Sequence, residues 1–143
     1  MFATLLFGSL LMTACSKVET NETAAADQGH ASGEHGASSS AGLPTGRIEA
    51  GEKRALVKSQ ATKQSCIDCH GAEGNAPIDA TYPKLGGQYA DYLGHALQNY
   101  RAKQRDHALM TPQASELSDQ DISDLAAYFA SRPSQLRDLH GLK

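Results

Sequence analysis

Two stretches in the second half of the chain repeat apolar residues at the spacing of an amphipathic helix. The pattern predicts helices over about residues 88–104 and 119–131, each with one buried face. Ser118 is a plausible N-cap for the second helix, and Pro133 marks its end. The residues expected on the buried faces are Tyr89, Tyr92, Leu93, Ala96, Leu97 and Tyr100 in the first helix, and Ile122, Leu125, Ala126 and Phe129 in the second.

Two further segments complete the expected architecture. Residues 49–60 mix Ala50, Ala55, Leu56 and Val57 with charged residues and predict a helix, and residues 66–70 predict a short one. No segment alternates between apolar and polar residues convincingly enough to predict a strand. We therefore expect an all-α fold of about four helices.

The first residues of the chain have the pattern of an export signal. Residues 2–12 are apolar, but the run is shorter than the roughly 20 residues that a membrane-spanning helix needs. Its length and small-residue ending fit the hydrophobic region of a signal peptide. The sequence Met12-Thr13-Ala14-Cys15 resembles a lipoprotein processing site, which predicts removal of residues 1–14 and lipidation of Cys15. An ordinary export signal, in which Cys15 has no role, is the alternative.

Composition separates a linker from a folded domain. Residues 15–48 consist mainly of Ala, Gly, Ser, Thr, Glu and His, which cannot bury enough apolar surface to fold, so we expect a flexible linker. His30 and His35 in this linker are expected to be solvated. Residues 49–143 form the expected domain. The net charge of −3, from 13 basic and 16 acidic residues, suggests no nucleic-acid partner.

The strongest chemical signal is the motif Cys66-Ile67-Asp68-Cys69-His70. The form C-x-x-C-H is typical of covalent haem c attachment. Two thiols one helical turn apart can add to the two vinyl groups on one edge of a porphyrin, and the imidazole of the next residue can then serve as the proximal iron ligand. The sequence therefore predicts one covalent haem c, held by Cys66, Cys69 and His70.

Two other uses of a C-x-x-C pair were considered. A thioredoxin-type redox motif belongs in a βαβ unit, and no parallel-strand pattern is present here. A structural zinc site needs two more Cys or His ligands at close spacing. The remaining cysteine, Cys15, is far away in a segment of a different kind. Both alternatives are less favoured than haem attachment.

Met110 is the best candidate for the second axial ligand. If processing removes residues 1–14, Met110 is the only methionine left, because the other two are Met1 and Met12. It lies in a loop-like segment between the second and third long helices, where it could face His70. His95 and His107 are rival ligands. We expect His95 on a helix surface, and His107 is the more serious rival because of its closeness to Met110.

At this point the chain resembles the class I c-type cytochromes, in particular the small bacterial ones. The resemblance runs from about residue 50 to 133. It rests on four elements in the family's order: Cys66–Gly74, the segment Tyr82–Tyr89, the methionine Met110, and the segment Leu117–Phe129. It implies a cytochrome c fold in which Cys66 and Cys69 hold the haem and His70 and Met110 are the axial ligands.

The resemblance also implies several supporting roles. The carbonyl of Pro83 would accept the other ring N–H of His70 and so orient it. Gly51 would let the first helix cross closely against Tyr128 on the last. Three tyrosines are expected as core and haem-packing residues, namely Tyr89, Tyr92 and Tyr100. The basic run of Arg101, Lys103 and Arg105 is either a solvated helix face or a contact for a haem propionate or an acidic partner.

These expectations combine into a function. An iron with both axial positions filled has no site for substrate, so we predict a single-electron carrier and no enzyme activity. A lipid at Cys15 would tether it to a membrane on the periplasmic side of a Gram-negative bacterium, near membrane-bound respiratory donors and acceptors. Two alternatives stay open: a haem subunit or electron acceptor of a periplasmic oxidoreductase, and a gas-binding or sensing haem protein.

Overall fold

The computed structural model describes residues 40–137, which contain five α-helices and no strand. The helices are α1 (Ile48–Ala55), α2 (Cys66–His70), α3 (Ala90–Arg101), α4 (Met110–Ala114) and α5 (Asp119–Ala130). The predicted all-α class is thus confirmed, with α4 as one helix more than expected. Within residues 40–137, no helix is long and apolar enough to cross a bilayer.

Helix α5 is the centre of the fold. Its sequence explains where it begins, because the hydroxyl oxygen of Ser118 accepts the N–H of Asp121 at 3.0 Å, and the Asp121 carboxylate accepts the N–H of Ser118 at 3.0 Å. This reciprocal capping satisfies two N–H groups at the start of the helix. Ser118 is therefore the N-cap that the sequence predicted. Most of the helix is buried, including Ile122, Leu125 and Phe129.

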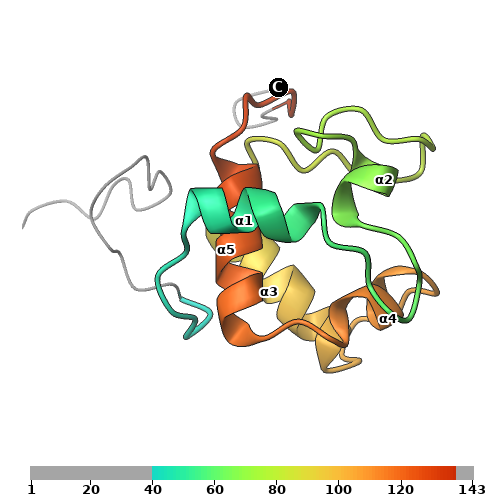
Figure 1. Ribbon diagram of the computed structural model, residues 1–143. Helices are drawn as coiled ribbons and strands as arrows, with labels where there is room; N and C mark the ends of the chain where they lie inside the picture. The colour runs from blue at the N-terminus through green and yellow to red at the C-terminus, as the bar shows by residue number, and fades with distance from the viewer. Residues whose placement is uncertain (1–39, 138–143) are drawn as a thin grey trace, which may run out of the picture.

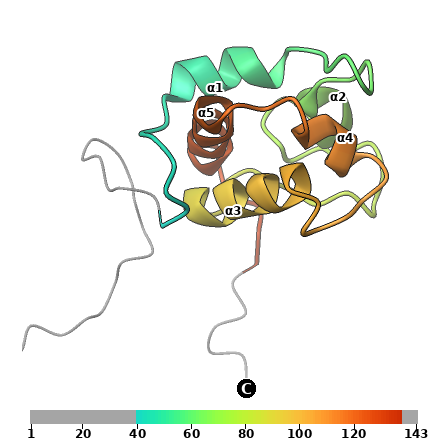
Figure 2. The same ribbon diagram turned by 90° about the horizontal axis from the view of Figure 1, so that it is seen from below.

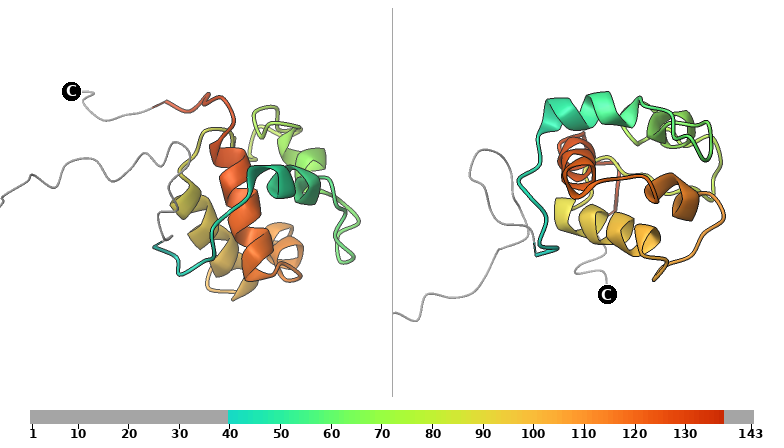
Figure 3. Two further views of the ribbon diagram at one scale, coloured as in Figure 1. Left: turned by 60° about the vertical axis from the view of Figure 1, so that its left-hand side comes forward. Right: turned by 60° about the horizontal axis from the view of Figure 1, so that its bottom comes forward.

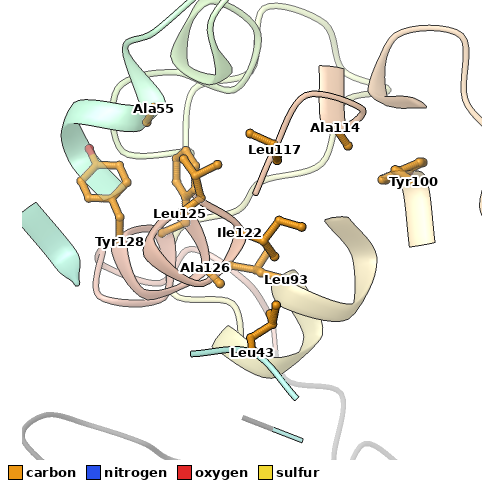
Figure 4. Packing of buried hydrophobic residues seen from close by; sticks show 11 residues of the cluster. Leu43, Ala55, Leu93, Tyr100, Ala114, Leu117, Ile122, Leu125, Ala126 and Tyr128 are labelled. Atoms are coloured by element: carbon orange, nitrogen blue, oxygen red, sulfur yellow. The ribbon is translucent and has the colours of Figure 1, made fainter. Parts of the chain in front are cut away.

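Two longer helices pack against opposite sides of α5. Figure 1 shows α1 crossing in front of α5 with α3 behind it, and Figure 2 shows α5 between the other two. The buried side chains in Figure 4 follow this arrangement: Tyr128 lies on the side of α1, and Leu93 joins the core from α3. The shorter helices α2 and α4 lie on the same side of α5 but apart from each other, α2 toward the top of Figure 1 and α4 toward the bottom.

Helix α1 can approach α5 closely because of one glycine. A Cβ atom at Gly51 would lie 1.9 Å from the backbone oxygen of Asp124 and 2.7 Å from Cβ of Tyr128. Both values are far below van der Waals contact, so only glycine fits at this crossing. The close approach of Gly51 to Tyr128 that the family resemblance implied is present in the structure.

The folded domain begins earlier than expected. Leu43 is 7% exposed and belongs to the core, although residues 15–48 were expected to be linker. The backbone N–H and the guanidinium of Arg47 both bind the buried carboxylate of Asp124, at 2.8 and 2.7 Å. One isolated leucine gives no periodic pattern, which is why the boundary near residue 48 was predicted too late.

Helix lengths also differ from the predicted ones. The first helix ends at Ala55 and not near residue 60, and α3 covers Ala90–Arg101 within the predicted 88–104. Leu56 and Val57, which were expected to continue the first helix, follow it and are 56% and 51% exposed. Apolar residues at helical spacing therefore overestimated α1 by more than one turn.

Candidate functional site

A cavity of about 610 Å³ lies beside α5, enclosed by α2, α3, α4 and the loops that connect them. The volume is in the range of small-molecule and cofactor sites. Figure 3 shows from two further sides where α2, α3 and α4 lie around α5. The wall is mostly apolar and includes Leu85, Leu93, Leu97, Leu125, Ala126 and Phe129. The domain therefore contains a cavity that can hold one large apolar group.

Helix α2 places both cysteines on the wall of this cavity. The helix begins after Ser65, whose N–H binds the Asp68 carboxylate at 2.8 Å. It ends at His70, and the C-cap residue Gly71 has φ +83° and ψ 161°, a conformation that residues with side chains strongly disfavour. Cys66 and Cys69 are both free and partly buried. The helix therefore stops directly after the motif, and Cys66, Cys69 and His70 all line the cavity.

His70 is buried and oriented by one hydrogen bond. Its side chain is 6% exposed, and its Nδ1 lies 2.9 Å from the carbonyl oxygen of Pro83, to which it donates. The Pro83 contact expected from the resemblance is thus present. Burial lowers the pKa of His70, opposed by the Pro83 hydrogen bond, and so favours the neutral ring. Nε2 keeps a free lone pair, which is the form that binds metals.

The thiols lack the chemistry of a redox pair. Burial raises the pKa of Cys66 to about 11, and burial also raises the pKa of Cys69. Reactive C-x-x-C pairs work by the opposite shift, toward thiolate. No group of three or more Cys, His, Asp or Glu side chains suited to a metal ion occurs within residues 40–137. The raised pKa values of the two thiols therefore disfavour a thioredoxin-type redox pair.

Met110 lies on the same cavity wall and comes from a different element. The sequence suggested a loop here, but Met110 is the first residue of α4. That short helix went unpredicted because five residues give no full apolar period. Met110 is partly buried and packs against the core cluster. The structure thus brings Met110, His70 and both cysteines to one cavity.

Hydrogen bonds join the Met110 side of the cavity to the loop that precedes Cys66. The carboxylate of Glu116 accepts the N–H groups of Gln60 and Ala61 at 3.0 and 3.1 Å, and Gln113 donates to the carbonyl of Gln64 at 3.1 Å. The bond from Gln60 is the main reason that the pKa of Glu116 is lowered. These polar residues could not be predicted from the sequence, because a polar side chain that holds loops together has no periodic pattern.

The two histidines that could compete with Met110 as iron ligands lie in different places. His95 is exposed on α3, where its ring bonds to the Ser40 hydroxyl at 3.1 Å, and it does not line the cavity. This surface placement agrees with the prediction. His107 does line the cavity, but its Nδ1 accepts hydrogen bonds from the N–H groups of Leu109 and Met110.

The tyrosines expected to pack together divide into different environments. Tyr100 is 9% exposed and lines the cavity, as predicted. Tyr89 and Tyr92 are each 53% exposed, so the prediction that they are core residues was wrong. Tyr92 still lines the cavity, whereas Tyr89 does not. Helical spacing alone could not tell a buried stripe from its solvent-facing border.

Two residues of the basic run, Arg101 and Arg105, have different roles. Arg101 binds the Asp119 carboxylate at 2.6 Å and the carbonyl of Leu117 at 2.9 Å, so it fastens α3 to the start of α5. Arg105 lines the cavity and lies over the Tyr100 ring at 4.7 Å. Among the described residues that line the cavity, the charged ones are Lys84, Arg105 and Arg137, and none is acidic. The cavity is therefore suited to an apolar group that carries negative charge.

Comparison with known proteins identifies the class of this site. The sequence profile of the family described as Cytochrome c matches residues 54–133, which is more than half of the chain. The chain therefore belongs to the cytochrome c family. The match covers α2, α3, α4 and α5 and every residue predicted for the site except Cys15.

The relatives differ in how much of their own length this chain covers. Cytochrome c-554(548) of Halomonas halodenitrificans is 49% identical over 73 residues, which are 48% of this chain and 84% of the relative. The thiosulfate dehydrogenase electron acceptor of Thiomonas intermedia is 38% identical over 71 residues, 49% of this chain and 33% of that protein. The crystal structure of cytochrome c4 from Pseudomonas stutzeri superposes with a TM-score of 0.52 at 32% identity, covering 60% of this chain and 48% of that one. This chain thus spans half or less of the last two proteins.

The residues present fit the family's cofactor, covalent haem c. A haem is a large apolar ring with two carboxylates at one edge, and the cavity is an apolar space with cations and no carboxylate among its described lining residues. Two cysteines lie at its edge, and an imidazole with a free Nε2 lies in its wall. The predicted cytochrome c fold and haem c cofactor are confirmed.

Proposed function

We propose that this cytochrome is a single-electron carrier whose haem iron is bound by His70 on one face and Met110 on the other, with Cys66 and Cys69 forming the thioether bonds. The observation that carries the proposal is that these four side chains line one apolar cavity. They come from α2 and α4, which are 39 residues apart along the chain. Electron transfer as such agrees with the family and its haem c relatives.

A haem held by Cys66, Cys69, His70 and Met110 would supply an iron able to accept and release one electron. The protein keeps the axial donors in place during that transfer. The Pro83 carbonyl holds the His70 ring and strengthens it as a donor, and the thioether of Met110 favours the ferrous state relative to a second imidazole. The hydrogen bonds from Glu116 and Gln113 to the loop before Cys66 connect the Met110 side of the cavity to the cysteine side.

Two further parts of the proposal concern location. Cys15, which lies outside the described residues, would carry a lipid after removal of residues 1–14 and tether the domain at the periplasmic side of a Gram-negative membrane. A tether raises the effective concentration of the carrier near membrane-bound donors and acceptors without any stronger contact. Mass spectrometry of the mature protein tests this directly, since processing at Cys15 leaves a diacylglyceryl group on the first residue.

A second candidate is a dedicated electron acceptor of one oxidoreductase. The relative in Thiomonas intermedia is named as an electron acceptor of thiosulfate dehydrogenase, which favours this role. A general carrier should be purified alone, whereas a dedicated acceptor should be purified together with its dehydrogenase in constant ratio. A gas-binding role requires a sixth position that is open, and a bound Met110 would close it.

Met110→Ala tests the ligand assignment. The variant should keep its haem through acid–organic extraction, because Cys66 and Cys69 are unchanged. It should lose the methionine sulfur as an iron ligand. We therefore expect a lower reduction potential and rapid carbon monoxide binding in the reduced state. Leu56→Ala, which changes an exposed leucine that does not line the cavity, is the control and should keep the potential. An unchanged spectrum and potential in Met110→Ala would show that another residue binds the iron.

A further inference from the structure

The ring of His107 contacts the backbone that carries Met110. Its Nδ1 accepts hydrogen bonds from the N–H groups of Leu109 at 3.2 Å and Met110 at 3.3 Å. The first N–H groups of a helix have no acceptor within the helix, and Leu109, the N-cap residue of α4, has no polar side chain to provide one. His107 thus provides the acceptor that Ser, Thr, Asp or Asn provides at most helices.

Thr111 closes the same segment from the other side. Its hydroxyl accepts the N–H of His107 at 2.9 Å and donates to the carboxylate of Asp106 at 2.8 Å. Its own N–H donates to the carbonyl of His107 at 3.0 Å. Met110 therefore lies between two residues, His107 and Thr111, that are bonded to each other twice.

We propose that His107 is a positioning residue: it fixes the backbone of Met110 so that the thioether is held toward the cavity, and it is not itself an iron ligand. A neutral imidazole that accepts at Nδ1 carries its hydrogen on Nε2, so neither ring nitrogen has a free lone pair for a metal. The inference rests on the proposed function in one respect, which is the assignment of Met110 as a ligand.

The chain allows the acceptor to be separated from the ring. In His107→Asn, the amide oxygen can take the place of Nδ1, because both atoms are attached to Cγ. In His107→Phe, a ring of similar size remains without any acceptor. His95→Phe changes an exposed histidine that does not line the cavity and is the control. The measurements, on the intact haem-containing protein, are carbon monoxide uptake by the reduced form and the long-wavelength absorption band of the ferric sulfur–iron bond.

His107→Phe should increase the fraction of reduced haem that is open to carbon monoxide about tenfold, which corresponds to about 1.4 kcal/mol. The sulfur–iron band should weaken in parallel. His107→Asn should stay within about twofold of the wild type, and His95→Phe should match it. Thr111→Val, which removes the hydroxyl from the same network, should change the uptake in the same direction as His107→Phe.

Two results would overturn this inference: carbon monoxide uptake in His107→Phe equal to that of the wild type, or His107→Asn as open as His107→Phe. Met110→Ala, measured alongside, separates this failure from a failure of the ligand assignment. If Met110→Ala opens the iron and His107→Phe does not, only the positioning role is wrong. If Met110→Ala leaves the sixth position closed and His107→Phe opens it fully, His107 is the ligand and both proposals fail.

Discussion

Replacing Gly51 with alanine should destabilise the domain strongly, although alanine is the better helix former. The new Cβ would lie 1.9 Å from the backbone oxygen of Asp124, whereas close C–H···O contacts lie at roughly 3.3 Å or more. Neither atom is at the end of a flexible side chain, so α1 would have to move away from α5 by roughly 1.4 Å to restore that contact distance. Figure 1 shows that this crossing joins the first and last helices of the fold.

Overpacking of this kind costs about 1–3 kcal/mol and sometimes more, and the helix propensity of alanine returns up to about 1 kcal/mol. Because the clash involves backbone, we take the upper part of the range and expect a net loss of about 2 kcal/mol. For a domain of this size, such a loss lowers Tm by about 8–16 °C. The assay is thermal unfolding of the haem-containing protein, followed by far-ultraviolet circular dichroism.

Gly94→Ala is the matched control, because Gly94 is also inside a helix. Its Cβ would meet a side-chain atom, Cδ1 of Leu43 at 2.9 Å, which can rotate away. We expect its Tm to stay within a few degrees of the wild type. A Gly51→Ala protein that is as stable as Gly94→Ala would refute the claim that the glycine is required by the helix crossing.

Two other predictions concern charge. Burial of Asp124 acts to raise its pKa, but hydrogen bonds from Arg47 and Gln120 outweigh burial and hold that pKa below its usual value. Its stabilisation is therefore full above about pH 4, the unfolded value, and is lost as the pH falls through the lower folded pKa. Asp124→Asn should be less stable at pH 7 and lose less stability below pH 4 in urea unfolding series. Arg105→Leu removes a cation from the cavity and should lower the reduction potential, more at low salt; a shift no larger than that of the exposed Lys103→Leu would contradict this.

The elements that the sequence revealed are those with a repeating or rare signal. Helix α5 was found from its apolar stripe and from Ser118, and the haem motif was found because two cysteines and a histidine at fixed spacing seldom occur for another reason. The close crossing at Gly51 was inferred only through resemblance to the family. The physical reason for glycine there is that a Cβ at position 51 would lie 1.9 Å from the backbone oxygen of Asp124, a contact between two helices far apart in the chain.

The parts that sequence reasoning missed depend on single long-range contacts. Leu43 joins the core without any periodic neighbour, so the domain boundary was misplaced. Glu116 reads as one more charged residue, yet it fastens the loop before the haem motif. His107 was treated as a competing ligand, because proximity along the chain does not show which ring nitrogen is already bonded.

The most direct measurement for the central claim is the NMR spectrum of the reduced protein with isotope-labelled methionine methyl groups. A methyl group fixed above the porphyrin is displaced far upfield by the ring current. We predict one such signal, which comes from the Met110 methyl group and is absent from Met110→Leu. Methionine methyl signals that all lie at ordinary positions would contradict the proposed His70 and Met110 pair.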